Sequence, residues 1–242
     1  MGTGTYALSE RMRKDPSMNL TYLSMGTEKP ICTTATHLRG FIANQFRKDV
    51  MFHNHEGESA TVYGYPVVQY KLIDQHPVVI GIGSGASKVE ALSERFSVLE
   101  LGGHGYKVLD MHLNTVNASF GHAQGVVPYA FFTPWLALNE ENYARYQASG
   151  PSERQRLLQR ILIGNILSMS KGLGYVVTQE IKVSQLDVYP VRTPVRLKGV
   201  EMTGFKGMFA VNFDLPDLIG LGKSVSRGFG TVRKIGANRP VG

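Results

Sequence analysis

The order of apolar patterns along the chain constrains its fold more than any single motif does. The first half alternates in type, with a strand, a helix, two strands and a second helix over residues 19–25, 33–49, 61–73, 77–82 and 87–101. The first helix is indicated by apolar side chains at helical spacing, namely Leu38, Phe41, Ile42 and Phe46. Strand, helix, strand pair and helix is the order of a ferredoxin-like unit, which one further strand completes.

The second half repeats this order loosely. Strands are expected over 106–120 and 126–138, a helix broken at Gly150–Pro151 over 140–170, and strands over 182–195 and 200–213. A chain of 242 residues has room for two such units. We therefore predict an α+β fold of two tandem ferredoxin-like (RRM-like) units with a C-terminal glycine-rich loop.

The predicted domains follow from these patterns. Residues 1–18 form a lead-in with little apolar periodicity, residues 19–103 form the N-terminal unit, and residues 104–242 form the C-terminal unit. The N-terminal unit carries a His-x-His loop, and the C-terminal unit carries the glycine-rich segment. The cluster Gly102-Gly103-His104-Gly105 is the best candidate for the connection between them.

The charge balance narrows the partners of the chain. Lys and Arg number 26 against 19 acidic residues, which gives a formal charge of +7, and a basic protein of this kind most often meets a polyanion such as nucleic acid. No run approaches the roughly 18 apolar residues of a membrane-spanning helix, and the N-terminus lacks a signal-peptide pattern. The single cysteine, Cys32, excludes an intrachain disulfide and a cysteine-cluster metal site. We expect a cytoplasmic protein with no membrane partner and no cofactor.

Two glycine motifs imitate nucleotide-binding sequences. Gly81-Ile-Gly-Ser-Gly-Ala86 follows an apolar strand and opens a helix, as a dinucleotide-binding turn does. Its surroundings are paired short strands rather than repeated βαβ units, which favours a tight strand-to-helix turn. Gly220-Leu-Gly-Lys-Ser224 imitates a phosphate loop, but Asp217 stands where that motif needs its first glycine. We therefore reject the NTPase interpretation.

The glycine-rich segment from Ile219 to Ile235 is the most informative part of the sequence. Glycines let the backbone approach an anion closely, while lysine, arginine and serine side chains supply charge and hydroxyl donors. Such a loop suits the phosphodiester backbone of RNA, where positioning contacts dominate. The alternative is a mobile basic tail. The candidate RNA-binding residues are Gly220, Gly222, Lys223, Ser224, Ser226, Arg227, Gly228, Gly230 and Arg233.

A second candidate site is His53-Asn54-His55, just beyond the first predicted helix. Two histidines can offer a neutral base and a charged acid near neutral pH. That pairing suits RNA self-cleavage, in which one group takes the 2′-hydroxyl proton and another protonates the leaving 5′-oxygen. A metal site lacks further ligands, and two ordinary loop histidines are the other alternative. The tyrosines Tyr63, Tyr65 and Tyr70 follow, and they either stack on bases, donate to a phosphate or belong to the core.

These stretches resemble a known family, the CRISPR repeat-processing endoribonucleases of the sixth Cas family, b subtype, within the RAMP superfamily. The matching stretches are His37-Leu-Arg-Gly-Phe-Ile-Ala-Asn44, Phe52-His-Asn-His55, Tyr63-Gly-Tyr-Pro-Val-Val-Gln-Tyr-Lys71, Val79-Ile-Gly-Ile-Gly83 and the terminal glycine-rich loop. The resemblance covers about residues 19–236. Gly64 departs from the pattern, which has a basic residue between the tyrosines.

The resemblance implies a fold of two ferredoxin-like units and an antiviral-defence activity. The family cuts precursor CRISPR RNA within its repeats without a metal, and the product often stays bound. Residue by residue, the resemblance implies His53, His55, Tyr63 and Lys48 as the catalytic group. Its implied partners are precursor CRISPR RNA, mature crRNA and other Cas effector subunits.

Two further interpretations stay open from the sequence. One is a non-catalytic RNA-binding subunit of a CRISPR effector complex, and the other is a nucleotide-dependent enzyme built on the Gly81 turn. If His53 and His55 are not catalytic, the next candidates are Tyr63 and the pair His37 and Lys48, which share one face of the first predicted helix with Asn44.

Overall fold

The structure of the protein is a computed structural model, and it describes residues 17–46, 64–93, 95–197 and 199–236. A first sheet comprises β1 (Ser17–Thr27), β2 (Val68–Ile73), β3 (His76–Ile82), β4 (Val98–Leu101) and β5 (His104–Ser119). Its strands are antiparallel and lie in the order β2-β3-β1-β5-β4. The long central strand β1 therefore pairs with β3 on one side and β5 on the other.

Helices cover one face of this sheet. They are α1 (Ala35–Gln45) and the short α3 (Ala86–Glu90), which a 3-10 turn, η1 (Gly83–Gly85), precedes. The apolar stripe predicted for the first helix is confirmed, because its members pack into a core with strand residues such as Leu23, Tyr70 and Val79. The opposite face of the sheet is left for the second unit.

The second unit begins directly after β5. Its elements are β6 (Gly121–Trp135), α4 (Glu140–Ala148), α5 (Pro151–Gly172), β7 (Val183–Pro190), β8 (Val195–Leu197), β9 (Val200–Met202), β10 (Phe205–Asp214) and β11 (Val232–Lys234). The main sheet runs in the order β11-β6-β10-β7, and β8 and β9 form a separate hairpin. Where a ferredoxin-like unit has its second helix, residues 215–231 form a loop with one 3-10 turn, η2 (Val225–Arg227).

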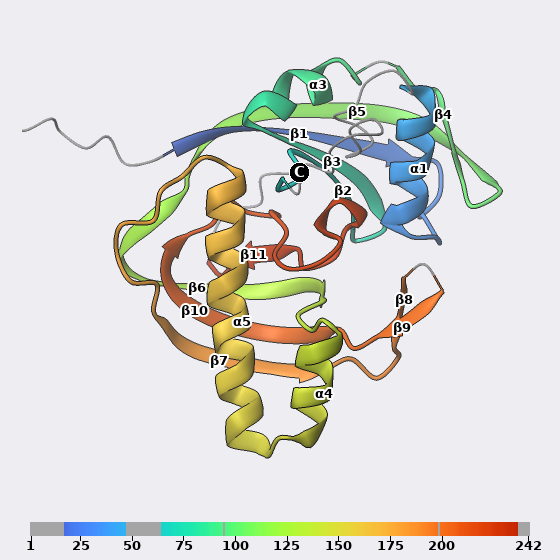
Figure 1. The fold of residues 1–242 in the computed structure, drawn as a ribbon. Coiled ribbons are helices and arrows are strands. Elements are labelled where there is room, and N and C mark those ends of the chain that lie inside the picture. Colours follow the sequence, from blue (N-terminus) through green and yellow to red (C-terminus); the bar gives the residue numbers. More distant parts are fainter. Residues whose placement is uncertain (1–16, 47–63, 94, 198, 237–242) are drawn as a thin grey trace, which may run out of the picture.

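A continuous apolar core joins the two units. Leu20 and Ile80 from the first sheet share it with Trp135 and Phe209 from the second sheet and with Ile166 from α5. Figure 1 shows the first sheet above the second, with the red C-terminal segment between them. The loop therefore lies where the two units meet, and both units position it.

The predicted α+β fold of two ferredoxin-like units is confirmed, and most predicted elements are present. The helix predicted over 87–101 is wrong in its second half. It ends at Glu90, and Val98–Leu101 forms β4, paired with β5. A short apolar run does not distinguish strand from helix, and here pairing with β5 decides for the strand. The strand predicted over 200–213 is likewise divided, into β9 and β10.

The glycine turn after β3 is a packing feature. Ile82 donates its N–H to the Val67 carbonyl at 2.8 Å, and a Cβ on Gly85 would collide with that same carbonyl oxygen. The turn leads into a five-residue helix beside an antiparallel sheet, which differs from the parallel βαβ unit that holds a dinucleotide. The strand-to-helix interpretation is confirmed.

Candidate nucleic-acid interface

The glycine-rich loop is a packed part of the structure and not a mobile tail. The side chains of Leu218, Ile219, Leu221 and Val225 are at most 4% exposed. The loop also bonds to β6, because Thr133 donates its hydroxyl to the Gly228 carbonyl at 2.6 Å and Gly230 donates its N–H to the Pro134 carbonyl at 2.9 Å. The alternative of a tail without fixed structure is therefore wrong for residues 215–236.

Gly228 lies where a side chain has no room. Its φ is +89°, and a Cβ there would lie 2.7 Å from the Ala35 Cβ on α1. We expect Gly228→Ala to lower the free energy of unfolding by about 1–3 kcal/mol, because it adds left-handed backbone strain to this collision. The measurement is thermal melting. Gly236→Ala is the matched control, since Gly236 has a φ of +84° but open space around it. Equal losses in the two variants would show that the contact with α1 does not matter.

Three glycine N–H groups of the loop are used inside the protein. Gly220 donates to the Gln69 side-chain oxygen at 3.1 Å, Gly228 donates to the Val225 carbonyl at 3.2 Å, and Gly230 donates to β6. These N–H groups are therefore not available to a phosphate in this structure, contrary to the role that the sequence suggests for Gly220 and Gly228. The glycines give the loop its path, and the outward chemistry falls to its side chains.

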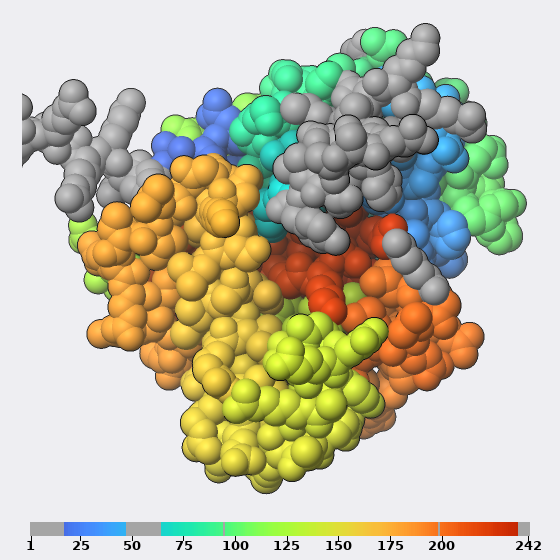
Figure 2. Space-filling model, viewed as in Figure 1, coloured from blue at the N-terminus to red at the C-terminus, as the bar shows by residue number. Residues whose placement is uncertain are grey.

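The outward side of the loop is polar and basic. Lys223 is exposed, and Ser224, Ser226 and Arg227 are partly exposed around η2. Figure 2 shows the red loop reaching the surface near the middle of this face, between the blue segment of α1 and the yellow segment of α5. The structure thus brings together the four polar side chains that the sequence placed at residues 223–227.

Arg39 on α1 extends this basic group. Helix α1 packs against η2, and burial followed by the positive charge of Arg227 lowers the pKa of Arg39. Two guanidinium groups that raise each other's energy bind an anion readily, because the anion relieves their repulsion. No local sequence pattern singles out Arg39, since its neighbour Arg227 is 188 positions away and only the fold brings them together.

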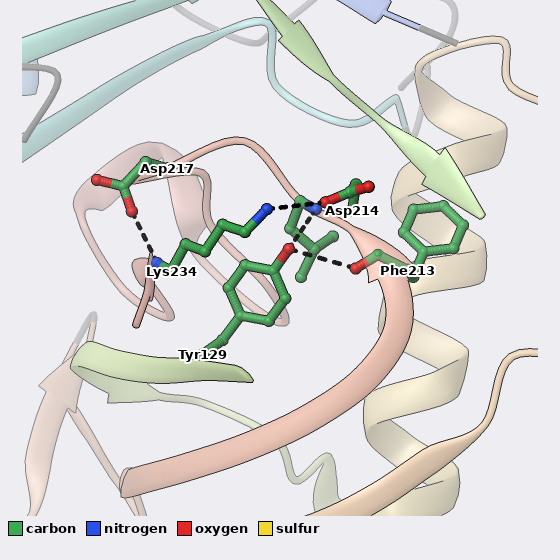
Figure 3. A network of polar contacts seen from close by, with 6 residues as sticks. Tyr129, Phe213, Asp214, Asp217 and Lys234 are labelled. Carbon is green, nitrogen blue, oxygen red and sulfur yellow. Dashed lines mark hydrogen bonds and ion pairs between the residues drawn. The ribbon is translucent and has the colours of Figure 1, made fainter. Parts of the chain in front are cut away.

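Two acidic side chains at the start of the loop, those of Asp214 and Asp217, are already engaged. Figure 3 shows Lys234 bonded to both, with its Nζ 3.1 Å from an Asp214 oxygen and its N–H donating to Asp217 at 2.8 Å. Burial raises the pKa of Asp217. These contacts fasten the start of the loop to β11, and Lys234 is a structural cation.

Arg233 is separate from the cations around η2. Its guanidinium lies 4.3 Å from the centre of the Phe132 ring, and it lines a hollow of about 440 Å³ together with His76, Asp110 and His112 of the first sheet. None of the η2 cations lines that hollow. The predicted set of RNA-binding residues is therefore divided, with Arg233 on a different part of the interface between the units.

The predicted catalytic residues His53, His55, Tyr63 and Lys48 lie outside the described residues. The chain is described up to Phe46, at the end of α1, and again from Gly64. Next to Gly64, Tyr65 donates its hydroxyl to the Gly220 carbonyl at 2.6 Å, and burial raises its pKa.

The two described tyrosines of this stretch make contacts inside the protein. Tyr65 bonds to the loop, and Tyr70 is 1% exposed in the core of the first unit. The interpretation as a core residue is therefore confirmed for Tyr70, and Tyr65 packs against the core while partly exposed.

His37, the alternative candidate for a catalytic histidine, faces away from the loop. It shares a hollow with Asn44 and Glu100, and its Nδ1 lies 2.5 Å from the Thr33 hydroxyl. The side of α1 that meets the loop carries Ala35 instead. His37 and Asn44 do share one face of α1, as predicted.

Two family models match the chain, one for each unit. The Cas6b N-terminal domain matches residues 17–119, and the Cas6b C-terminal domain matches residues 121–235. The chain belongs to the Cas6b family. The two matched regions meet at the turn between β5 and β6, and β5 pairs with β1 of the first sheet. The sequence pattern suggested a division after Gly103. We propose instead that the two units of this Cas6b protein divide at Phe120.

Solved Cas6b structures resemble this Cas6b chain over most of its length. A crystal structure of Cas6b is 37% identical, with a TM-score of 0.82, over 90% of this chain and 100% of that chain. Another, of the CRISPR RNA processing endoribonuclease Cas6b, is 36% identical with a TM-score of 0.70 over the same shares. Uncharacterized protein MJ0978 of Methanocaldococcus jannaschii is 40% identical over 137 residues, which are 57% of this chain and 92% of that protein.

The described part of this Cas6b chain contains no helix that is long and apolar enough to cross a membrane. Within the same residues, no group of three or more His, Cys, Asp or Glu side chains is arranged to hold a metal ion.

Proposed function

We propose that this Cas6b protein is an endoribonuclease that cleaves precursor CRISPR RNA within its repeats without a metal ion. The observation that carries the proposal is the match of both Cas6b domains to residues 17–235, together with 36% identity to a CRISPR RNA processing endoribonuclease. We infer that its partners are precursor CRISPR RNA, mature crRNA and other Cas effector subunits.

The proposed chemistry is an internal transesterification. The 2′-oxygen of the nucleotide before the cut attacks the phosphorus, and the bond to the 5′-oxygen breaks. One of His53 and His55 accepts the 2′-hydroxyl proton, and the other gives a proton to the leaving 5′-oxygen. Tyr63 and Lys48 assist by stabilising charge on the phosphate. The products are a 2′,3′-cyclic phosphate and a 5′-hydroxyl.

Binding is assigned to the loop. Lys223 and Arg227 hold phosphates by charge, and Ser224 and Ser226 donate hydroxyl hydrogen bonds beside them. Gly220, Gly222, Gly228 and Gly230 contribute by giving the loop its course, and Arg233 holds a more distant part of the RNA. Binding and proton transfer are thus assigned to different groups, the first to the loop and the second to His53 and His55.

The test of metal independence is cleavage in EDTA. The protein is incubated with an RNA copy of a repeat from the CRISPR array of the same genome, with and without EDTA. We expect equal rates, a 5′-hydroxyl product, and no cleavage of an RNA with 2′-deoxyribose before the cut, because that RNA lacks the nucleophile. A strict requirement for Mg²⁺ or 5′-phosphate products would contradict the mechanism. A gel shift without cleavage would favour a non-catalytic RNA-binding subunit.

A further inference from the structure

A lysine lies fully buried beneath the glycine-rich loop. Lys71 on β2 is 0% exposed, and so is Gln69 two residues earlier on the same face of the strand. The alternate residues Val68 and Tyr70 pack into the core under α1. Lysine is almost never fully buried unless it is paired, because its charge loses hydration. No ion pair to Lys71 is found among the described residues.

The contact that Lys71 makes is with the loop. Its Nζ donates to the Val225 carbonyl at 3.3 Å, across 154 positions of sequence. Val225 is the first residue of η2, so this carbonyl belongs to the peptide that leads into Ser226 and then Arg227. The Val225 side chain is itself buried and packs closely on Gly220. Lys71 therefore holds the inner side of the turn whose outer side carries the basic residues.

Neighbouring residues hold the loop at a second point. Gln69 accepts the Gly220 N–H, and Tyr65 donates to the Gly220 carbonyl, so both polar atoms of that residue are bound. The N-terminal unit thus grips the loop of the C-terminal unit at Gly220 and at Val225. Of these two contacts, the one at Val225 uses a charged group, the ammonium of Lys71. An apolar side chain would pack there without losing the hydration of a charge.

We propose that Lys71 is a positioning residue for RNA binding, which holds the η2 turn so that Ser226 and Arg227 face the RNA backbone. The proposal rests on the proposed function for the identity of the ligand. The buried ammonium serves binding at the expense of stability, since a hydrophobic side chain of similar length fills the same space more favourably.

The protonation of Lys71 gives this arrangement a signature in pH. Burial lowers the pKa of Lys71 to about 7. The charged or titratable groups on the elements packed against β2 are His37 and Arg39 on α1, His76 on β3, Lys88 and Glu90 on α3 and Arg227 on η2, with Tyr70 on β2 itself. A phosphate bound above η2 favours the ammonium over the amine, so RNA binding takes up a proton and affinity falls as pH rises through the folded pKa.

The stability of the RNA-free protein has the opposite pH dependence. Because the pKa of Lys71 is lowered from its usual value of 10.5 to about 7, the unfolded state binds more protons between these two values. The free energy of unfolding therefore rises with pH over that window. Replacement of Lys71 by an uncharged side chain removes both effects.

The decisive variant is Lys71→Met, with Thr21→Val as a control that removes a buried hydroxyl far from the loop and His76→Gln as a control for histidine titration. We expect Lys71→Met to melt at or above the wild-type temperature at pH 6. Its affinity for the repeat RNA should fall about tenfold, with a flatter dependence on pH from 6 to 9. Both controls should keep the wild-type affinity and its pH dependence. Wild-type affinity in Lys71→Met, or loss of affinity only in proportion to lost stability, would overturn the proposal.

A measurement on the RNA-free wild-type protein covers the case in which Lys71→Met does not fold. The Ser226 N–H shares its peptide group with the Val225 carbonyl, which accepts from Lys71. Its NMR signal should therefore shift with pH, with a midpoint near the pKa of Lys71. The same shift and midpoint are expected in the His76→Gln variant. An unchanged signal from pH 6 to 9 would overturn the hold of Lys71 on the turn. If the wild type does not bind repeat RNA, the proposed function fails, while this signal still decides whether Lys71 positions the loop.

Discussion

Replacement of His53 and His55 together by alanine is expected to reduce single-turnover cleavage at saturating protein by more than either single change. Loss of one general acid or base typically costs about 10²–10⁴-fold in rate. RNA affinity should change little, because the binding groups that we propose lie on the loop and on α1. The measurement is the cleavage rate constant for each single variant and the double variant, beside the dissociation constant for an RNA that carries 2′-deoxyribose at the cut.

His37→Ala is the matched control for that experiment. His37 is an exposed histidine of the same unit, on the side of α1 that also carries Asn44 and lines a hollow with Glu100. We expect it to cleave at the wild-type rate. If the double variant cleaves at the wild-type rate, the assignment of His53 and His55 is wrong, and the catalytic group must be sought at Lys48 and Tyr63.

Removal of the cations around η2 is expected to have the largest effect on affinity. Lys223→Ala and Arg227→Ala should each weaken binding by a similar factor for related RNA sequences, because contacts to phosphate carry no sequence information. Each should reduce the slope of log affinity against log salt by roughly 0.7, the value for one phosphate of a single strand. At saturating protein, cleavage should persist.

Arg160→Ala provides the matched loss of one positive charge. Arg160 is exposed on α5 in a hollow with Arg145 and Arg156, away from the loop. It should leave affinity and salt slope close to wild type. An equal loss in Arg160→Ala would show that net charge, and not the loop, sets the affinity. Lost cleavage at saturation in Arg227→Ala with unchanged affinity would instead place the loop in the catalytic centre.

The order of elements and the family were both accessible from local sequence patterns. The apolar residues Leu38, Phe41 and Ile42 repeat at helical spacing, and that spacing alone predicts α1, because a helix buries one stripe of its own residues. The glycine-rich loop was also recognisable locally, because its lysine, arginine and glycine residues follow one another closely in the sequence. The His-x-His segment and the stretch after it carried the resemblance to Cas6 proteins. Each of these signals spans at most about 20 residues.

The run at residues 98–101 and the burial of Lys71 were not accessible in this way. The apolar run forms a strand because β5 pairs with it. The local sequence does not distinguish Lys71 from an exposed lysine of a strand, because its burial depends on η2, which packs over it in the fold. The separation of Arg233 from Arg227 likewise depends on which unit each side chain meets, and not on their six positions of sequence distance.

Sequence by itself therefore determined the two-unit α+β architecture, the family and the chemistry of the loop. The tertiary structure alone decided which groups of the loop remain for a ligand. Gln69 accepts a hydrogen bond from the Gly220 N–H across 151 positions of sequence, and Lys71 donates one to the Val225 carbonyl across 154. The physical reason is that a buried polar group must find a partner, and when the partner lies on another unit only the packed fold shows which one it is.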